Sequence, residues 1–141
     1  MPIDIINNQA LPNIDGLSTI TQASLITISN NDLLTNIDGL SSLTTIQGSL
    51  TISNNNNLPN LDGLSSLKSI GPDPGEMGIY TIPVLGISGN DELTNLDGLS
   101  SVNSYIHISI NSNQALTDID GLSSMTRTLD IFIGNNDALT N

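Results

Sequence analysis

Hydrophobic residues along this chain follow a pattern that returns about every 23 residues. In the clearest copy, five apolar residues spaced by three are followed by two spaced by two: Leu34, Ile37, Leu40, Leu43, Ile46, Leu50 and Ile52. A period of two predicts a strand with one buried face. The run with period three is short and rich in Ser and Thr, which favours a coiled path over an α-helix. Each repeat is therefore predicted to contain one strand and one coil.

The strand recurs six times, as Ile3–Ile5, Ser24–Ile28, Leu50–Ile52, Leu85–Ile87, Ile108–Ile110 and Ile131–Ile133. The repeats align on Leu11, Leu34, Leu58, Leu93, Leu116 and Leu139. A fixed period in this range is typical of a solenoid, whose strands stack in parallel about 4.8 Å apart. The prediction is a mainly β, parallel solenoid that forms a single repeat domain over residues 1–141. It has about six rungs of 23–24 residues and little or no α-helix.

Three polar columns accompany the repeats. The first contains Asn8, Asn31, Asn55, Asn90, Asn113 and Asn136, the second contains Asn13, Asn36, Asn60, Asn95, Asp118 and Asn141, and the third contains Asp15, Asp38, Asp62, Asp97 and Asp120. Stacked Asn side chains can bond one another and the turning backbone. Each Asp of the third column precedes Gly and Leu, so we expect the Asp to accept backbone N–H groups, the Gly to bend the chain and the Leu to enter the core. The columns are predicted to be structural, and Ca²⁺ binding by the Asp row is a minor alternative.

The spacing of the Asp-Gly-Leu phrase breaks once. It is 35 residues between Asp62 and Asp97, against 23 or 24 elsewhere. The extra residues form an insertion at 71–83 that is rich in Pro and Gly, which predicts a protruding loop. Repeat proteins often carry function in such insertions. Met77, Ile79 and Tyr80 are therefore the predicted binding residues.

Charge and composition exclude several classes of function. The chain has 14 acidic residues, two basic residues and no Cys. A net charge of -12 argues against nucleic acid, and no apolar run is long enough for membrane insertion. No thiolate metal site or cofactor motif occurs, so neither a metal nor a cofactor is predicted. The first residues lack the basic and apolar regions of a signal peptide.

A catalytic site is not predicted either. His107 is the only His, and it alternates with two Ile residues, which places it on the outer face of a strand. None of the many Ser and Thr residues lies in a nucleophile motif. The evenly repeated carboxylates do not form the single acid–base pair that catalysis needs. The chain is predicted not to be an enzyme.

The segment Leu50–Asn55 matches the core of the leucine-rich repeat, and the preceding phrase Ile37-Asp-Gly-Leu-Ser-Ser-Leu43 resembles the receptor L-domain branch of that family. The resemblance covers essentially the whole chain. It implies a right-handed parallel solenoid that acts as a recognition module at the cell surface or outside the cell. Receptor versions carry disulfide-bonded caps, and this chain has no Cys.

The predicted function is a non-enzymatic recognition or scaffold module with an unidentified protein or other surface ligand. Outward strand positions are small and mostly hydroxylated, and they lack the Trp, Tyr and Arg that dominate protein interfaces. Contact is therefore expected at the loop. One alternative is a structural element that self-associates through its uncapped end rungs, as a homo-oligomer. Ordering of water or ice by the Thr/Ser face is a minor alternative.

Overall fold

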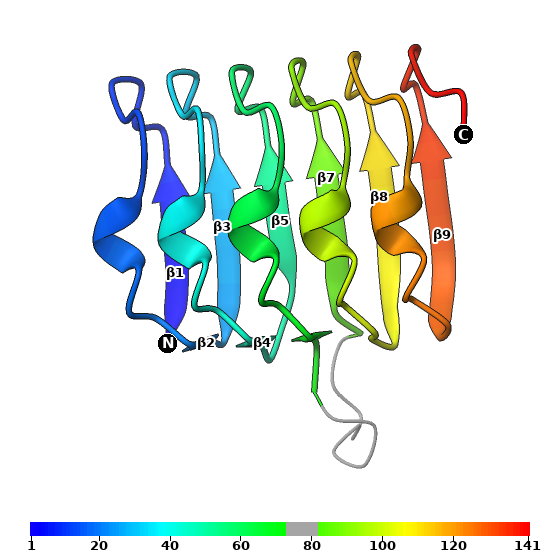
Figure 1. The fold of residues 1–141 in the computed structure, drawn as a ribbon, viewed down its shortest axis with the longest axis horizontal. Coiled ribbons are helices and arrows are strands. Elements are labelled where there is room, and N and C mark those ends of the chain that lie inside the picture. Colours follow the sequence, from blue (N-terminus) through cyan, green and yellow to red (C-terminus); the bar gives the residue numbers. More distant parts are fainter. Residues whose placement is uncertain (73–81) are drawn as a thin grey trace.

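A computed structural model of the chain describes residues 1–72 and 82–141. In these residues, six strands form one parallel sheet in the order β1-β3-β5-β7-β8-β9, and three short strands form a second sheet in the order β2-β4-β6. Figure 1 shows the rungs side by side, with the N-terminus at one end of the row and the C-terminus at the other. The predicted mainly β, parallel solenoid is confirmed.

The large sheet forms the back of the molecule in Figure 1, and a row of single helical turns lies in front of it. Its strands are β1 (Pro2–Ile6), β3 (Leu25–Ser29), β5 (Leu50–Ser53), β7 (Val84–Ser88), β8 (Ile106–Asn111) and β9 (Thr128–Gly134). The turns are 3-10 helices: η1 (Asp15–Leu17), η2 (Asp38–Leu40), η3 (Asp62–Leu64), η4 (Asp97–Leu99) and η5 (Asp120–Leu122). The described residues contain no α-helix, as expected.

The small sheet contains β2 (Gln22–Ala23), β4 (Thr45–Ile46) and β6 (Ser69–Ile70). It was not expected from the sequence, because two residues are too few to show a period of two. Ala23, Ile46 and Ile70 point inward from these strands and are at most 2% exposed. The small sheet therefore forms a corner of each of three rungs and closes the core on that side.

The strand register pairs equivalent residues of successive rungs. Ile26 pairs with Leu50 and Leu50 with Leu85, so one inward column runs through the sheet. In the second repeat, the residues with spacing three are all inward and at most 1% exposed: Leu34, Ile37, Leu40, Leu43 and Ile46. The period-three run is therefore a coil that contributes one core residue at each step, as predicted.

The two end rungs are covered on one side only. Ile5, Leu11 and Leu17 at the N-terminal end pack against the core but stay partly exposed. At the C-terminal end, Ile133 is partly exposed and Ile131 is 55% exposed, although its counterpart Ile108 in β8 is buried. The ends therefore present apolar surface that interior rungs cover with a neighbour.

Glycine in the Asp-Gly-Leu phrase is required by contact between rungs. A Cβ atom at Gly39, Gly63, Gly98 or Gly121 would collide with the carbonyl oxygen of the residue that precedes the helical turn in the previous rung. Each of these glycines is the middle residue of a 3-10 turn, and none has a positive φ, so the close contact between rungs rather than backbone strain requires glycine there. A Cβ atom added to Gly16, in the first rung, would have no other atom within 4 Å.

The variants Gly63→Ala and Gly16→Ala form a matched pair that tests this contact. Gly63→Ala should lower the free energy of unfolding by at least about 1–3 kcal/mol, because a methyl group is forced against the Ile37 carbonyl. Gly16→Ala should leave it within about 0.5 kcal/mol. Urea unfolding monitored by circular dichroism measures both. Equal effects of the two substitutions would contradict the rung-contact explanation.

Candidate functional site

The Asn column forms a hydrogen-bonded chain along the solenoid. From Asn31 through Asn136, the Oδ1 atom of each Asn accepts the backbone N–H of the Asn in the previous rung, at 2.9–3.2 Å. From the second rung to the fifth, the Nδ2 group also donates to the Oδ1 atom of the next Asn, at 3.1–3.3 Å. In addition, Nδ2 donates to a strand carbonyl of the previous rung, as from Asn55 to Ile28 at 3.0 Å.

These Asn side chains lie in the protein interior. Asn31, Asn55, Asn90 and Asn113 are fully buried, and Asn136 is 9% exposed. Among the described residues, no buried side-chain nitrogen or oxygen lacks a hydrogen-bond partner. The residue before each Asn has a positive φ of 54–64°. That position contains Asn7, Asn30, Asn54, Gly89, Ser112 and Asn135, mostly residue types that adopt the left-handed conformation at low cost.

The Asp column does not make the hydrogen bonds expected of it. No side-chain hydrogen bond caps any of the five 3-10 helices. The backbone N–H of each Asp instead donates to a side-chain oxygen two residues earlier, at 3.1–3.3 Å: Asn13, Asn36, Asn60, Asn95 or Asp118. The Asp side chains are exposed, because carboxylates repeated at rung spacing repel one another and are better solvated. The expected turn therefore exists, with the earlier residue as the acceptor.

Calcium binding by this column gains no support. Among the described residues, no three His, Cys, Asp or Glu side chains come together in a group that could hold a metal ion. A calcium site needs six to eight oxygen ligands around one point. A straight row of exposed carboxylates does not supply that arrangement.

The outer face of the large sheet is mostly uncharged. The register aligns one outward column as Asp4, Thr27, Thr51, Gly86, Ser109 and Phe132. Thr occupies only two of these six positions, and the column ends on Phe132, which is 58% exposed. The five Asp residues of the acidic column lie on the opposite side, at the 3-10 helices in front of the sheet in Figure 1. This face can therefore approach a partner with less repulsion than the net charge of -12 suggests.

His107 lies on this face, as predicted from its alternation with Ile. Its Nδ1 atom is 3.0 Å from Oδ2 of Asp130 on β9, and its side chain is 35% exposed. Beyond Asp130, no acidic residue in the described part of the chain pairs with it. The arrangement is a surface contact between neighbouring strands.

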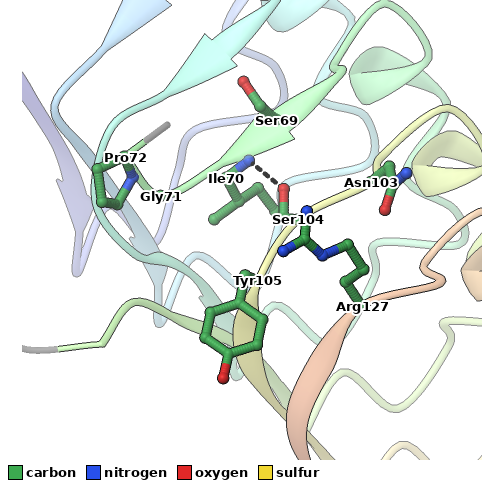
Figure 2. A pocket seen from close by; sticks show the side chains of 8 residues that line it. All are labelled: Ser69, Ile70, Gly71, Pro72, Asn103, Ser104, Tyr105 and Arg127. Carbon is green, nitrogen blue, oxygen red and sulfur yellow. Dashed lines mark hydrogen bonds between the residues drawn. The ribbon is translucent and has the colours of Figure 1, made fainter. Parts of the chain in front are cut away.

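A pocket opens at the corner of the solenoid near the small sheet. Its volume is about 100 Å³, and it is lined by Ser69, Ile70, Gly71, Pro72, Asn103, Ser104, Tyr105 and Arg127. Figure 2 shows the guanidinium group of Arg127 turned toward Ser104, with the ring of Tyr105 on the same side. The Ser104 hydroxyl accepts the backbone N–H of Ile70 at 2.7 Å and holds the two rungs together. Among the described residues, no acidic side chain lines the pocket and Arg127 forms no ion pair.

The insertion begins at this pocket. Gly71 and Pro72, its first two residues, are lining residues, whereas Met77, Ile79 and Tyr80 lie outside the described residues. Sequence reasoning did not bring Tyr105 and Arg127 together. The signal was available, because Arg127 lies 22 residues after Tyr105, close to one repeat length, and Ile106 pairs with Thr128.

Replacing one interior Asn tests the hydrogen-bonded chain. Asn55→Ala removes the acceptor of the buried Asn31 N–H and the donor to Ile28. It should lower the free energy of unfolding by about 1–3 kcal/mol for each buried group left unpaired. Asn57→Ala, at an exposed turn position, is the matched control and should leave stability unchanged. Identical urea midpoints for the two variants would contradict a structural role of the ladder.

A second pair of variants separates the two residues of the turn. Asn60→Ala removes the acceptor of the Asp62 N–H and should cost about 1 kcal/mol. Asp62→Ala should be neutral or slightly stabilising, within about 0.5 kcal/mol, because it removes a repulsive charge and no capping bond. Thermal unfolding at low and high salt measures both, since added salt should reduce any gain from Asp62→Ala. A larger loss from Asp62→Ala than from Asn60→Ala would reverse the assignment.

No helix within the described residues is long and apolar enough to cross a membrane. No curated protein and no solved structure matches the chain. The family model of the receptor L domain matches residues 18–121, which include three complete Asp-Gly-Leu turns (η2, η3 and η4) and four strands of the large sheet. Receptor L domains are non-enzymatic, ligand-binding modules of the extracellular part of receptors. With a match over most of its length, the chain belongs to the receptor L-domain family.

Proposed function

We propose that this chain is a non-enzymatic recognition module that binds a protein ligand through the corner pocket and the adjoining outer face of the large sheet. Membership of the receptor L-domain family supports ligand binding. We further propose that the chain acts at the cell surface or outside the cell, as modules of this family do. The position of the contact on the solenoid is inferred from side-chain chemistry.

The observation that carries the proposal is the pairing of Tyr105 and Arg127 in one pocket. Tyr and Arg are among the residue types that contribute most to binding free energy at protein interfaces. Arg127 is one of only two basic residues in the chain, and it makes no ion pair with a described residue. Within the described part of the chain, no carboxylate therefore competes with a ligand for its guanidinium group.

The pocket favours an acidic group of the ligand. A guanidinium group binds a carboxylate through two parallel hydrogen bonds, and Asn103 beside it can donate a further bond. A volume of about 100 Å³ suits one side-chain carboxylate or a chain terminus rather than a whole small molecule, because drug-sized ligands occupy about 300–1,000 Å³. The rest of the ligand would extend over the sheet face, where few carboxylates oppose it.

The insertion at 71–83 is proposed as a second part of this contact. Its first residues line the pocket, and Met77, Ile79 and Tyr80 supply large apolar groups, of which the outward column of the sheet face has only Phe132. Aromatic and Met side chains are enriched at interface cores. The pocket would hold the acidic group, and these three residues would supply buried apolar area.

Selection from a displayed peptide library against the immobilised chain tests the proposal. Enriched peptides should contain a carboxylate that binding requires, and Arg127→Ala should weaken their binding at least about tenfold, as expected for loss of an interface Arg. Lys68→Ala is the matched control, because Lys68 is the other basic residue, is exposed and does not line the pocket. Peptides that bind Arg127→Ala as well as the parent chain would contradict the assignment of the pocket.

The same peptides test the insertion. Simultaneous replacement of Met77, Ile79 and Tyr80 by Ala should weaken binding while the thermal midpoint stays unchanged. If Arg127→Ala weakens binding and the triple variant does not, the pocket alone forms the contact. If neither substitution affects binding, the proposed surface is wrong.

A further inference from the structure

The small sheet ends inside the solenoid, at the corner pocket. Strand β4 is paired on both sides, with β2 and with β6, whereas β6 is paired only with β4. The chain returns to β6 at Asn103, whose backbone N–H donates to the Lys68 carbonyl at 3.1 Å. It then leaves this sheet, and no fourth strand is added to it within the described residues. The edge of β6 therefore meets a side chain at the place where β4 meets another strand.

That side chain belongs to Ser104. Its Oγ atom accepts the backbone N–H of Ile70 at 2.7 Å, the bond drawn as a dashed line in Figure 2. Ser104 is only 7% exposed, so this bond fixes its hydroxyl group in the wall of the pocket. A hydroxyl group can donate one hydrogen bond and accept two, and the bond from Ile70 uses one acceptor position. Within the described part of the chain, no group accepts the hydroxyl proton of Ser104.

Two donors therefore lie together in the pocket without an acceptor for either. Figure 2 shows the guanidinium group of Arg127 turned toward Ser104. A guanidinium group can only donate, and no acidic side chain among the described residues lines the pocket. Even if Arg127 donated to the second acceptor position of Ser104, the hydroxyl proton would still need an acceptor. A carboxylate placed between the two side chains would accept from both.

The bond from Ile70 also makes Ser104 a stronger donor. Hydrogen bonds in a chain polarise one another, so a hydroxyl group that accepts from an N–H donates more strongly. A bond to an ionised acceptor is stronger again, and burial of Ser104 limits competition by water. Ser69 also lines the pocket, but it is half-buried and its hydroxyl group points away from Arg127 in Figure 2. The two serines are therefore expected to contribute unequally.

We propose that Ser104 is a specificity-determining residue of the pocket and that it selects a carboxylate over a carboxamide. This inference rests on the proposed binding of an acidic group beside Arg127. One carboxylate oxygen accepts from the Ser104 hydroxyl group while the other accepts from the guanidinium group. A carboxamide has a single oxygen and an NH₂ group, so one of the two protein donors would face another donor. A polar group left unpaired in this way is the basis of discrimination by hydrogen-bonded sites.

Titration of the full chain with two small probes, followed by NMR at neutral pH, tests the proposal. The probes are N-acetyl-glutamate and N-acetyl-glutamine, both with an amidated backbone carboxyl, so that they differ only in the side-chain group. The amide signal of Ile70 reports on the site directly, because its N–H donates to Ser104. The carboxylate probe should shift this signal and bind at least about tenfold more tightly than the carboxamide probe, as expected for hydrogen bonds to a charged group.

Variants of the two serines assign the preference to one hydroxyl group. Ser104→Ala should weaken binding of the carboxylate probe about tenfold and leave binding of the carboxamide probe within about twofold. Ser104→Thr retains a hydroxyl group and should keep the preference, and Ser69→Ala is the matched control within the same pocket. Because Ser104→Ala also removes the acceptor of the Ile70 N–H, Ser104→Cys serves as a second variant. It keeps a side chain of similar size whose thiol donates only weakly, so it should lose the preference as well.

The outcomes separate the role of Ser104 from the proposed function of the pocket. Loss of the preference in Ser104→Ala or Ser104→Cys, with retention in Ser104→Thr, would support the proposal. If Arg127→Ala weakens binding of the carboxylate probe while the Ser104 variants keep the parent preference, Ser104 has no such role and the pocket assignment stands. Equal affinity of the parent chain for the two probes would also overturn the proposal. An Ile70 signal that neither probe shifts would overturn both the role of Ser104 and the assignment of an acidic group to this pocket.

Discussion

The hydrogen-bonded chain of buried Asn side chains is the interaction on which the rest of the structure depends. Each amide satisfies backbone groups at the end of one strand and links them to the next rung. Without it, the backbone would turn away from the sheet with unpaired N–H and carbonyl groups in a dry interior, which costs more than the bonds themselves contribute. The ladder thus allows the turn to be buried, and the buried turn lets Leu34 and its counterparts complete the core.

The same repetition distributes function unevenly. Interior rungs are nearly equivalent, so a singular site can arise only where the repeat is interrupted or where it ends. The pocket at Tyr105 and Arg127 lies beside the interruption, and the exposed apolar faces lie at the ends. The proposed ligand contact uses the place where the repeat is interrupted.

The repeat also determines where the negative charge lies on the molecule. The carboxylates of the Asp column are repeated at every turn but bond to nothing within those turns, so they remain in solvent. The outer face of the sheet, which carries few of them, is left for recognition.

The sequence by itself determined the parallel solenoid, the inward columns and the buried Asn positions, because a short repeat makes each of these features recur and so become visible. The tertiary structure decided three things that the repeat pattern did not show. It showed that Asn60 rather than Asp62 accepts at the turn, that Gly63 is required by the Ile37 carbonyl of another rung, and that Tyr105 and Arg127 share a pocket. The first depends on how side chains are oriented within one turn, and the other two depend on which atoms of adjacent rungs come into contact. A linear pattern specifies neither.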